Sequence, residues 1–203
     1  MAKGVLLILC GPSGVGKTSL SNALLESRKP LSLSVSYTTR KRRGREVDGV
    51  NYQFVDEGEF LTMREADKFA EWAEVHGNYY GTTRETIERA WREGRDLLFD
   101  IDYQGARQLK EVYPEATAVL VAPPDLKTLE ERLRGRGTDS EEVIQRRLSA
   151  ACHELKQYAL FDYIVENKEF QKAQQVLQAI YDAARHSRSV KRRWLEALLA
   201  REK

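Results

Sequence analysis

The chain has 203 residues, of which 41% are hydrophobic and 32% are charged, and its formal net charge at pH 7 is +2. This composition excludes an extensively disordered chain, and the near-balanced charge gives no general attraction for nucleic acid or membranes, so any anion site must be local. The two cysteines, Cys10 and Cys152, lie far apart in sequence, which indicates a cytoplasmic protein rather than a disulfide framework.

An apolar run at residues 4–10 predicts a strand that is buried on both faces and too short to cross a bilayer. Leucines with helical spacing follow at residues 18–26. Further apolar runs, at residues 96–101, 117–122 and 163–165, each precede a polar segment of helical character. This alternation predicts an α/β fold with a central parallel sheet flanked by helices, whose ligand-binding loops lie at the carboxyl edge of the strands.

Two segments interrupt the alternation. Residues 37–88 contain short alternating stretches, which predict an inserted subdomain of antiparallel strands. Residues 132–147 are rich in arginine and predict a mobile loop followed by a helix from about Ser140. We expect a single domain, residues 1–203, with a core at about 1–36, 89–131 and 155–203, an insert at about 37–88 and a lid at about 132–154.

The last segment, residues 187–203, combines a basic cluster at residues 191–193 with Trp194 and three leucines at helical spacing. The pattern predicts an amphipathic helix that packs its apolar face, including Trp194, on the domain. Contact with a membrane or with a partner protein is the alternative interpretation.

The stretch ILCGPSGVGKTSL, residues 8–20, matches the phosphate-binding pattern G-x-x-x-x-G-K-[ST] between a predicted strand and a predicted helix. Glycines let backbone N–H groups surround phosphate oxygens, and the helix N-terminus adds positive charge. Lys17 is expected at the β- and γ-phosphates of a nucleoside triphosphate, and Thr18 on Mg²⁺. Asp100, at the end of another predicted strand, is a second candidate for Mg²⁺ or its water ligands. The nucleotide-binding residues expected here are Gly11, Pro12, Ser13, Gly14, Val15, Gly16, Lys17, Thr18 and Ser19.

Four further motifs are TTRKRR (residues 38–43), EWA (71–73), GNYYGT (77–82) and DIDYQG (100–105). Together with the phosphate loop they resemble the guanylate kinase family over nearly the whole chain, from Val5 to Asn167. The resemblance implies a P-loop fold with a GMP-binding insert and an arginine-rich lid. It also implies direct, Mg²⁺-dependent transfer of the γ-phosphate of ATP to GMP, with dGMP as a further acceptor and a role in purine nucleotide metabolism.

By this resemblance, five residues hold the GMP phosphate: Ser36, Arg40, Arg43, Tyr52 and Tyr80. Paired guanidinium groups suit a phosphate because each can bond two oxygens in one plane. The guanine-reading residues that the resemblance implies are Glu71, Thr82 and Asp102. A carboxylate accepts hydrogen bonds from the N1–H and N2–H₂ groups of guanine, whereas adenine leaves the carboxylate unpaired, and such sites discriminate strongly.

The resemblance also assigns catalytic arginines in the lid: Arg132, Arg136 and Arg147. With Lys17 and Arg40 they complete the implied catalytic set, because positioned cations stabilise the charge spread over a moving phosphoryl group. Arg134 and Arg146 are interpreted as surface charges. Asn167 corresponds to a residue near the adenine pocket of ATP.

The sequence departs from the family pattern at Glu166 and at the Gly44–Arg45 turn. Two alternatives to a GMP kinase stay open: a non-enzymatic scaffold that binds phosphorylated partners, and a kinase for another monophosphate such as AMP or a sugar phosphate. The intact phosphate loop favours an enzyme, and Glu71 with Asp102 favours GMP over AMP. The expected partners are therefore ATP and GMP, without nucleic acid or membrane, in a monomer or a homodimer.

Overall fold

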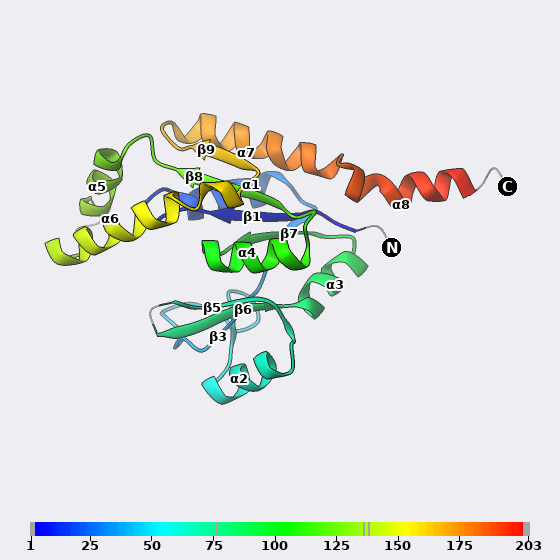
Figure 1. The fold of residues 1–203 in the computed structure, drawn as a ribbon, viewed down its shortest axis with the longest axis horizontal. Helices are drawn as coiled ribbons and strands as arrows, with labels where there is room; N and C mark the ends of the chain where they lie inside the picture. The colour runs from blue at the N-terminus through cyan, green and yellow to red at the C-terminus, as the bar shows by residue number, and fades with distance from the viewer. Residues whose placement is uncertain (1–2, 76, 136, 138, 201–203) are drawn as a thin grey trace.

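The structure is a computed structural model and describes residues 3–75, 77–135, 137 and 139–200 (Figure 1). The elements in chain order are β1 (Leu6–Cys10), α1 (Lys17–Ser27), β2 (Leu31–Leu33), β3 (Tyr37–Thr38), β4 (Gln53–Phe54), α2 (Glu57–Glu65), β5 (Phe69–Val75), β6 (Asn78–Thr83), α3 (Arg84–Arg92), β7 (Asp96–Asp100), α4 (Tyr103–Val112), β8 (Thr117–Ala122), α5 (Leu126–Arg134), α6 (Glu141–Leu155), the 3₁₀ turn η1 (Tyr158–Leu160), β9 (Tyr163–Glu166), α7 (Phe170–Arg185) and α8 (Arg188–Leu199).

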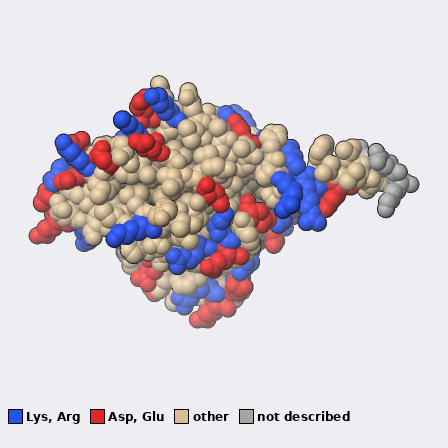
Figure 2. All heavy atoms as spheres, turned by 45° about the horizontal axis from the view of Figure 1, so that its top comes forward, with Lys and Arg blue, Asp and Glu red and all other residues tan. Residues whose placement is uncertain are grey.

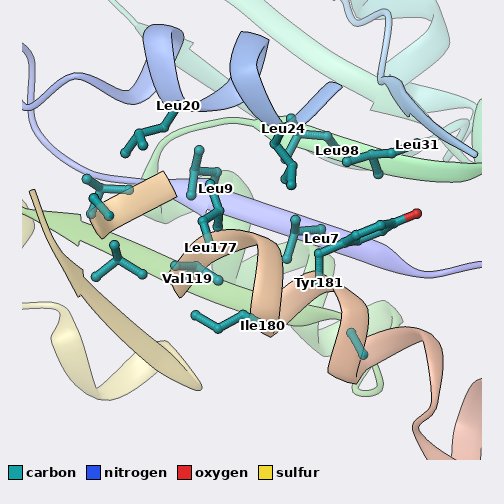
Figure 3. Packing of buried hydrophobic residues seen from close by; sticks show 14 of the residues in the cluster. Leu7, Leu9, Leu20, Leu24, Leu31, Leu98, Val119, Leu177, Ile180 and Tyr181 are labelled. Carbon is teal, nitrogen blue, oxygen red and sulfur yellow. The ribbon is translucent and has the colours of Figure 1, made fainter. Parts of the chain in front are cut away.

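The central sheet has the strand order β2-β7-β1-β8-β9, and all its strands are parallel. The side chains of β1 alternate between its faces, as a strand requires. Leu7 and Leu9 pack with residues of α1 and α7 on one face, where Leu20 and Tyr181 are fully buried (Figure 3). Leu6, Ile8 and Cys10 pack on the other face with residues of α3 and α4. The predicted parallel sheet with flanking helices is confirmed.

The sheet topology brings two predicted site segments together. β1 lies between β7 and β8, and Leu9 of β1 is level with Asp100 at the end of β7. The phosphate-loop sequence follows β1 directly and leads into α1. Asp100 and the phosphate loop therefore share the carboxyl edge of the sheet, which is where parallel sheets bind ligands.

Residues 37–83 contain a second sheet of order β4-β3-β6-β5, with α2 packed against it through Phe60 and Met63. The prediction of purely antiparallel strands was wrong in one pairing, because β3 pairs in parallel with β4. A short turn would force two consecutive strands to be antiparallel, but residues 39–52 separate β3 from β4. This connection is long enough for the chain to return and pair in parallel. β5 and β6 do form an antiparallel hairpin.

In the arginine-rich segment, helix α5 continues to Arg134, so Arg132 lies in a helix rather than in the predicted loop. The connecting segment, residues 135–140, is correspondingly short, and α6 follows its N-cap Ser140 as predicted. Arg134 is exposed, as expected of a surface charge. Its guanidinium group also donates to the carboxylates of Glu130 and Glu141, and so links α5 to α6 across the connection.

The apolar face of the C-terminal helix α8, formed by Trp194, Leu195, Leu198 and Leu199, does not pack on the domain, and this corrects the prediction from its amphipathic pattern. Val190, near the start of the helix, does pack against the core. No residue of α8 is buried, and the helix extends away from the body of the molecule (Figure 1). The core is already closed by α7, whose last buried residues are Tyr181 and Ala184. No helix among the described residues has the length and hydrophobicity required to cross a membrane.

Candidate active site

The phosphate loop is a tight turn whose glycines have no room for side chains. Gly11 has φ of 147°, and a Cβ there would lie 2.3 Å from the carbonyl oxygen of Val121. Gly16 has φ of 99° and is the N-cap of α1, with no side chain to cap the first turn. The first N–H groups of α1 therefore remain available for an anion at this end of the helix.

Lys17 lies across the mouth of the loop. Its Nζ donates to the carbonyl oxygen of Gly11 at 2.8 Å and is 3.7 Å from Oδ1 of Asp100. Burial raises the pKa of Asp100, and the Lys17 ammonium opposes this shift. Thr18 and Ser19 are exposed in the first turn of α1. The predicted lysine, hydroxyl and carboxylate groups thus belong to adjoining segments at one end of the sheet.

Asn167 and Arg132 donate hydrogen bonds to backbone carbonyl oxygens at or beside the phosphate loop. The Nδ2 of Asn167 donates to the carbonyl oxygen of Val15 at 2.7 Å, and the backbone N–H of Asn167 donates to Ala122. The guanidinium group of Arg132 donates to the carbonyl oxygens of Asn167, at 2.9 Å, and of Val15, at 3.5 Å. Both side chains are thus anchored on the backbone beside the phosphate loop.

Arg147 reaches the loop from α6. Its Nη1 donates to Oγ of Ser13 at 3.3 Å and is 3.4 Å from Oδ2 of Asp139, a side chain that is largely buried. Arg147 therefore contacts the loop at Ser13, whereas Arg132 contacts it at Val15. Arg136, the third predicted lid arginine, lies outside the described residues.

A second pocket, of about 260 Å³, opens between the central sheet and the inserted sheet. Its lining includes five residues that were expected at the GMP site, namely Ser36, Tyr52, Glu71, Tyr80 and Asp102. The expected metal ligand Asp100 also lines it. Thr82 is fully buried, and its hydroxyl forms a hydrogen bond with that of Ser36 at 3.0 Å. These residues come from the β5–β6 hairpin, from the end of β7 and from the segments just before β3, β4 and α4.

The carboxylate of Glu71 is the most unusual group in this pocket. Glu71 is only 3% exposed, and no described residue gives its Oε1 a hydrogen bond. Burial raises the pKa of Glu71 to about 7, although hydrogen-bond donors of Thr82 act in the other direction. A buried carboxylate oxygen without a hydrogen-bond donor is costly to the fold, so the unpaired Oε1 beside a pocket indicates a ligand that supplies N–H or O–H donors.

Asp102 combines its place in the pocket with a structural role. Its Oδ1 accepts hydrogen bonds from the backbone N–H groups of Gln104 and Gly105, at 3.1 and 2.9 Å, and so caps α4. The capping holds the carboxylate at the mouth of the pocket in a fixed orientation.

Arg40 is buried and oriented by a residue that was not expected at the site. Its guanidinium group donates to Oε1 of Glu46 at 2.8 Å and lies 5.3 Å from the ring of Tyr52. The other oxygen of Glu46 accepts from the backbone N–H of Arg43 at 2.8 Å, and the Arg40 bond lowers the pKa of Glu46. Glu46 thus sets the position of Arg40 and of the backbone at Arg43.

Two further residues that support Glu71 were also not identified from the sequence. A Cβ at Gly105 would lie 2.7 Å from Oε2 of Glu71, so this glycine leaves the space that the carboxylate occupies. Gln108, one turn later in α4, exchanges two hydrogen bonds with the backbone of Trp72 and ties α4 to β5. The sequence pointed to Gly105 only as the last residue of the DIDYQG motif, and it did not point to Gln108.

Comparison with known proteins gives the family. The guanylate kinase family model matches residues 3–184. A guanylate kinase of Aromatoleum aromaticum is 48% identical over 182 residues, which cover 90% of this chain and 89% of that protein. One of Hahella chejuensis is 45% identical over 199 residues, covering 98% and 96%. The crystal structure of guanylate kinase from Anaplasma phagocytophilum has a TM-score of 0.75 and 31% identity, covering 93% of this chain and 90% of that one. The chain therefore belongs to the guanylate kinase family.

Proposed function

We propose that this protein transfers the γ-phosphate of ATP to GMP and so produces ADP and GDP. The observation that carries the proposal is the buried carboxylate of Glu71, which has an unpaired oxygen beside a pocket next to the phosphate loop. Guanine supplies the two adjacent N–H donors that such a carboxylate lacks, whereas adenine supplies an acceptor at the same edge. Family membership supports the same reaction.

In this mechanism the protein positions two polyanions and compensates their charge. The backbone of residues 11–16 and Lys17 would hold the triphosphate of ATP, and Arg40 and Arg43 would hold the phosphate of GMP. The GMP phosphate oxygen attacks the γ-phosphorus in line, the bond to the β-phosphate oxygen breaks, and ADP leaves. Arg147, with Arg132 and Arg136, would stabilise the charge that spreads over the transferring group.

The residues present fit a magnesium ion. The hydroxyl of Thr18 and the carboxylate of Asp100 are hard oxygen donors beside the phosphate loop, as Mg²⁺ prefers. No group of three or more His, Cys, Asp or Glu side chains among the described residues could hold a metal ion by itself, so triphosphate oxygens and water would complete the coordination. Bound Mg²⁺ would neutralise charge on the phosphates, and the Lys17 ammonium would add to this neutralisation.

A panel of acceptor nucleotides tests the proposal. With Mg²⁺–ATP as donor, GMP and dGMP should be phosphorylated efficiently, IMP less well because it lacks the 2-amino group, and AMP and UMP by a factor of about 10⁴ less well. ADP release measured by a coupled assay reports each rate. A preference for AMP would assign the chain to another monophosphate, and absence of turnover with every acceptor would favour the scaffold alternative.

Substitution of Gly105 by alanine should weaken GMP binding selectively. The new methyl group would displace the Glu71 carboxylate, since the two would otherwise be 2.7 Å apart. The KM for GMP is expected to rise by about tenfold, with the KM for ATP unchanged, because a hydrogen bond to a charged group contributes about 1.5–3 kcal/mol.

Gly58→Ala is the matched control for this substitution. Gly58 also lies within a helix, and its Cβ would meet only Oδ1 of Asp56, at 3.3 Å. Both substitutions favour the helix to a similar extent. Equal effects of the two on the KM for GMP would show that Gly105 does not act through Glu71.

A further inference from the structure

Asp139 is a largely buried carboxylate to which the mechanism above gives no role. It lies in the connection between α5 and α6, directly before Ser140, the N-cap of α6. Its side chain is only 13% exposed, and no described residue donates a hydrogen bond to its Oδ2. A buried oxygen without a donor is costly to the fold, and groups that are costly to the fold are typical of functional sites.

Asp139 does not act as a helix cap. Asp56, Asp102 and Asp125 each accept a hydrogen bond from a backbone N–H group in the first turn of the helix that follows. In α6 the N-cap Ser140 forms no such bond through its side chain, and Oδ2 of Asp139 accepts none from the described part of the chain. Capping therefore does not account for this carboxylate.

The group that faces Asp139 is the guanidinium group of Arg147, in the second turn of α6. Nη1 of Arg147 is 3.4 Å from Oδ2 of Asp139, which is close enough for an ion pair but lacks the geometry of a hydrogen bond. The same Nη1 donates to Oγ of Ser13 in the phosphate loop. Neither Nε nor Nη2 of Arg147 bonds a described residue, so the edge formed by these two nitrogens is available for two oxygens of a phosphoryl group.

The connection that carries Asp139 is itself held in place. Arg134, at the end of α5, donates to Glu141, at the start of α6, at 2.7 Å, and the N–H group of Gly137 donates to the carbonyl oxygen of Arg134 at 3.0 Å. Basic and acidic side chains are interspersed at the end of the molecule that α5 and α6 form (Figure 2), so the exposed charge there has no single sign that could orient Arg147. A buried carboxylate on a fixed segment can orient it.

We propose that Asp139 is a positioning residue, which orients the guanidinium group of Arg147 toward the phosphoryl group that moves from ATP to GMP. This inference rests on the proposed function. Without the ion pair Arg147 keeps its charge but samples other rotamers, because its side chain is long and flexible. A displacement of about 1 Å is enough to remove much of the stabilisation of a transition state. Asp139 does not line the pocket that contains Glu71, so binding of GMP should not depend on it.

A double-mutant cycle tests whether Asp139 acts through Arg147. Asp139→Asn keeps the shape of the side chain and removes its charge, and it should lower kcat with GMP by about 10- to 100-fold. Arg147→Ala should lower kcat by about 10³-fold. In the Arg147→Ala protein, the further change Asp139→Asn should alter kcat by less than about twofold, because the two residues act as a unit. Calorimetric titration should give affinities for GMP alone and for ADP alone within about twofold of the original values in Asp139→Asn.

Glu142→Gln is the matched control. Glu142 is an exposed carboxylate in the first turn of α6, so its substitution also removes one negative charge near the N-terminus of this helix. Glu142→Gln should leave kcat unchanged. Thermal unfolding should show that Asp139→Asn lowers the melting temperature no more than Glu142→Gln does, because Oδ2 of Asp139 accepts no hydrogen bond from a described residue.

Three results would overturn the role of Asp139. The first is a kcat that Asp139→Asn lowers by the same factor with and without Arg147, which would show that Asp139 acts on the structure rather than on this arginine. The second is an unchanged kcat in Asp139→Asn, and the third is an equal loss of kcat in Glu142→Gln. The intact protein is assayed in parallel. Absence of GMP phosphorylation by the intact protein would overturn the proposed function as well, whereas its presence with any of these three results would overturn the role of Asp139 alone.

Discussion

Replacement of Lys17 by alanine is expected to lower turnover by about 10³-fold and to leave the affinity for GMP within about twofold of its original value. Lys17 bonds the carbonyl oxygen of Gly11 and faces Asp100, so its ammonium lies at the mouth of the phosphate loop. It does not line the pocket that contains Glu71. Its loss should therefore remove charge compensation for the triphosphate without changing the acceptor site.

Two measurements separate these effects. A coupled assay of ADP release gives turnover, and calorimetric titration with GMP alone gives acceptor affinity. Lys41→Ala is the matched control because Lys41 is an exposed cation beside the acceptor site. An equal loss of GMP affinity and turnover in Lys17→Ala would contradict the division between a triphosphate site and a monophosphate site.

Replacement of Glu71 by glutamine should lower kcat/KM for GMP by about 10³-fold or more, with little change in the KM for ATP. An amide can accept only one of the two N–H groups of guanine, and its own NH₂ group faces the other as a second donor. Glu74→Gln is the matched control, because Glu74 lies three residues after Glu71 in the same strand and is exposed. It also removes one carboxylate and should have almost no effect on kcat/KM for GMP. A parallel loss of ATP affinity in Glu71→Gln would indicate a structural role.

The raised pKa of Glu71 gives this prediction a pH dependence. The ionised carboxylate binds guanine, so as pH falls below about 7 the KM for GMP should rise by about tenfold per pH unit. The same dependence should be absent in Glu71→Gln, and this comparison separates Glu71 from the titration of GMP itself. A pH profile shared by both proteins would exclude Glu71 as the titrating group.

Stability should respond to Glu71 in the opposite sense. The folded protein retains a proton on Glu71 up to pH of about 7, whereas the unfolded chain releases it near 4.5. The unfolded state therefore binds fewer protons in this window, and the free energy of unfolding should fall by about 3 kcal/mol as pH rises through it. Thermal unfolding of the ligand-free protein at both ends of the window should show this decrease, and Glu71→Gln should not.

The sequence predicted those parts of the fold that depend on local patterns. Continuous apolar runs identified four of the five strands of the central sheet, since strands buried on both faces leave such runs. It missed β2, because a segment of three residues between turns carries too little pattern. The docked position expected for α8 was wrong for a different reason. An amphipathic pattern shows which face of a helix is apolar, but it does not show which molecule covers that face.

The candidate site shows the same limit at the level of single residues. Motifs located the phosphate loop and Glu71, whose neighbours in sequence are themselves distinctive. Glu46 and Gln108 were not identified, because their roles come from partners that the fold brings to them: Arg40 for Glu46, and the backbone of Trp72 for Gln108. Gln108 is recognisable only once α4 and β5 are seen side by side. Glu46 is recognisable only once the connection between β3 and β4 is seen to place it against Arg40.

A crystal structure with bound GMP tests the central claim most directly, because the account depends on which group pairs with the guanine edge. The prediction is that N1–H and N2–H₂ of guanine lie within hydrogen-bonding distance of the Glu71 carboxylate, next to Asp102, with the phosphate on Arg40 and Arg43. A guanine ring bound elsewhere, with the Glu71 oxygen still unpaired, would contradict the account.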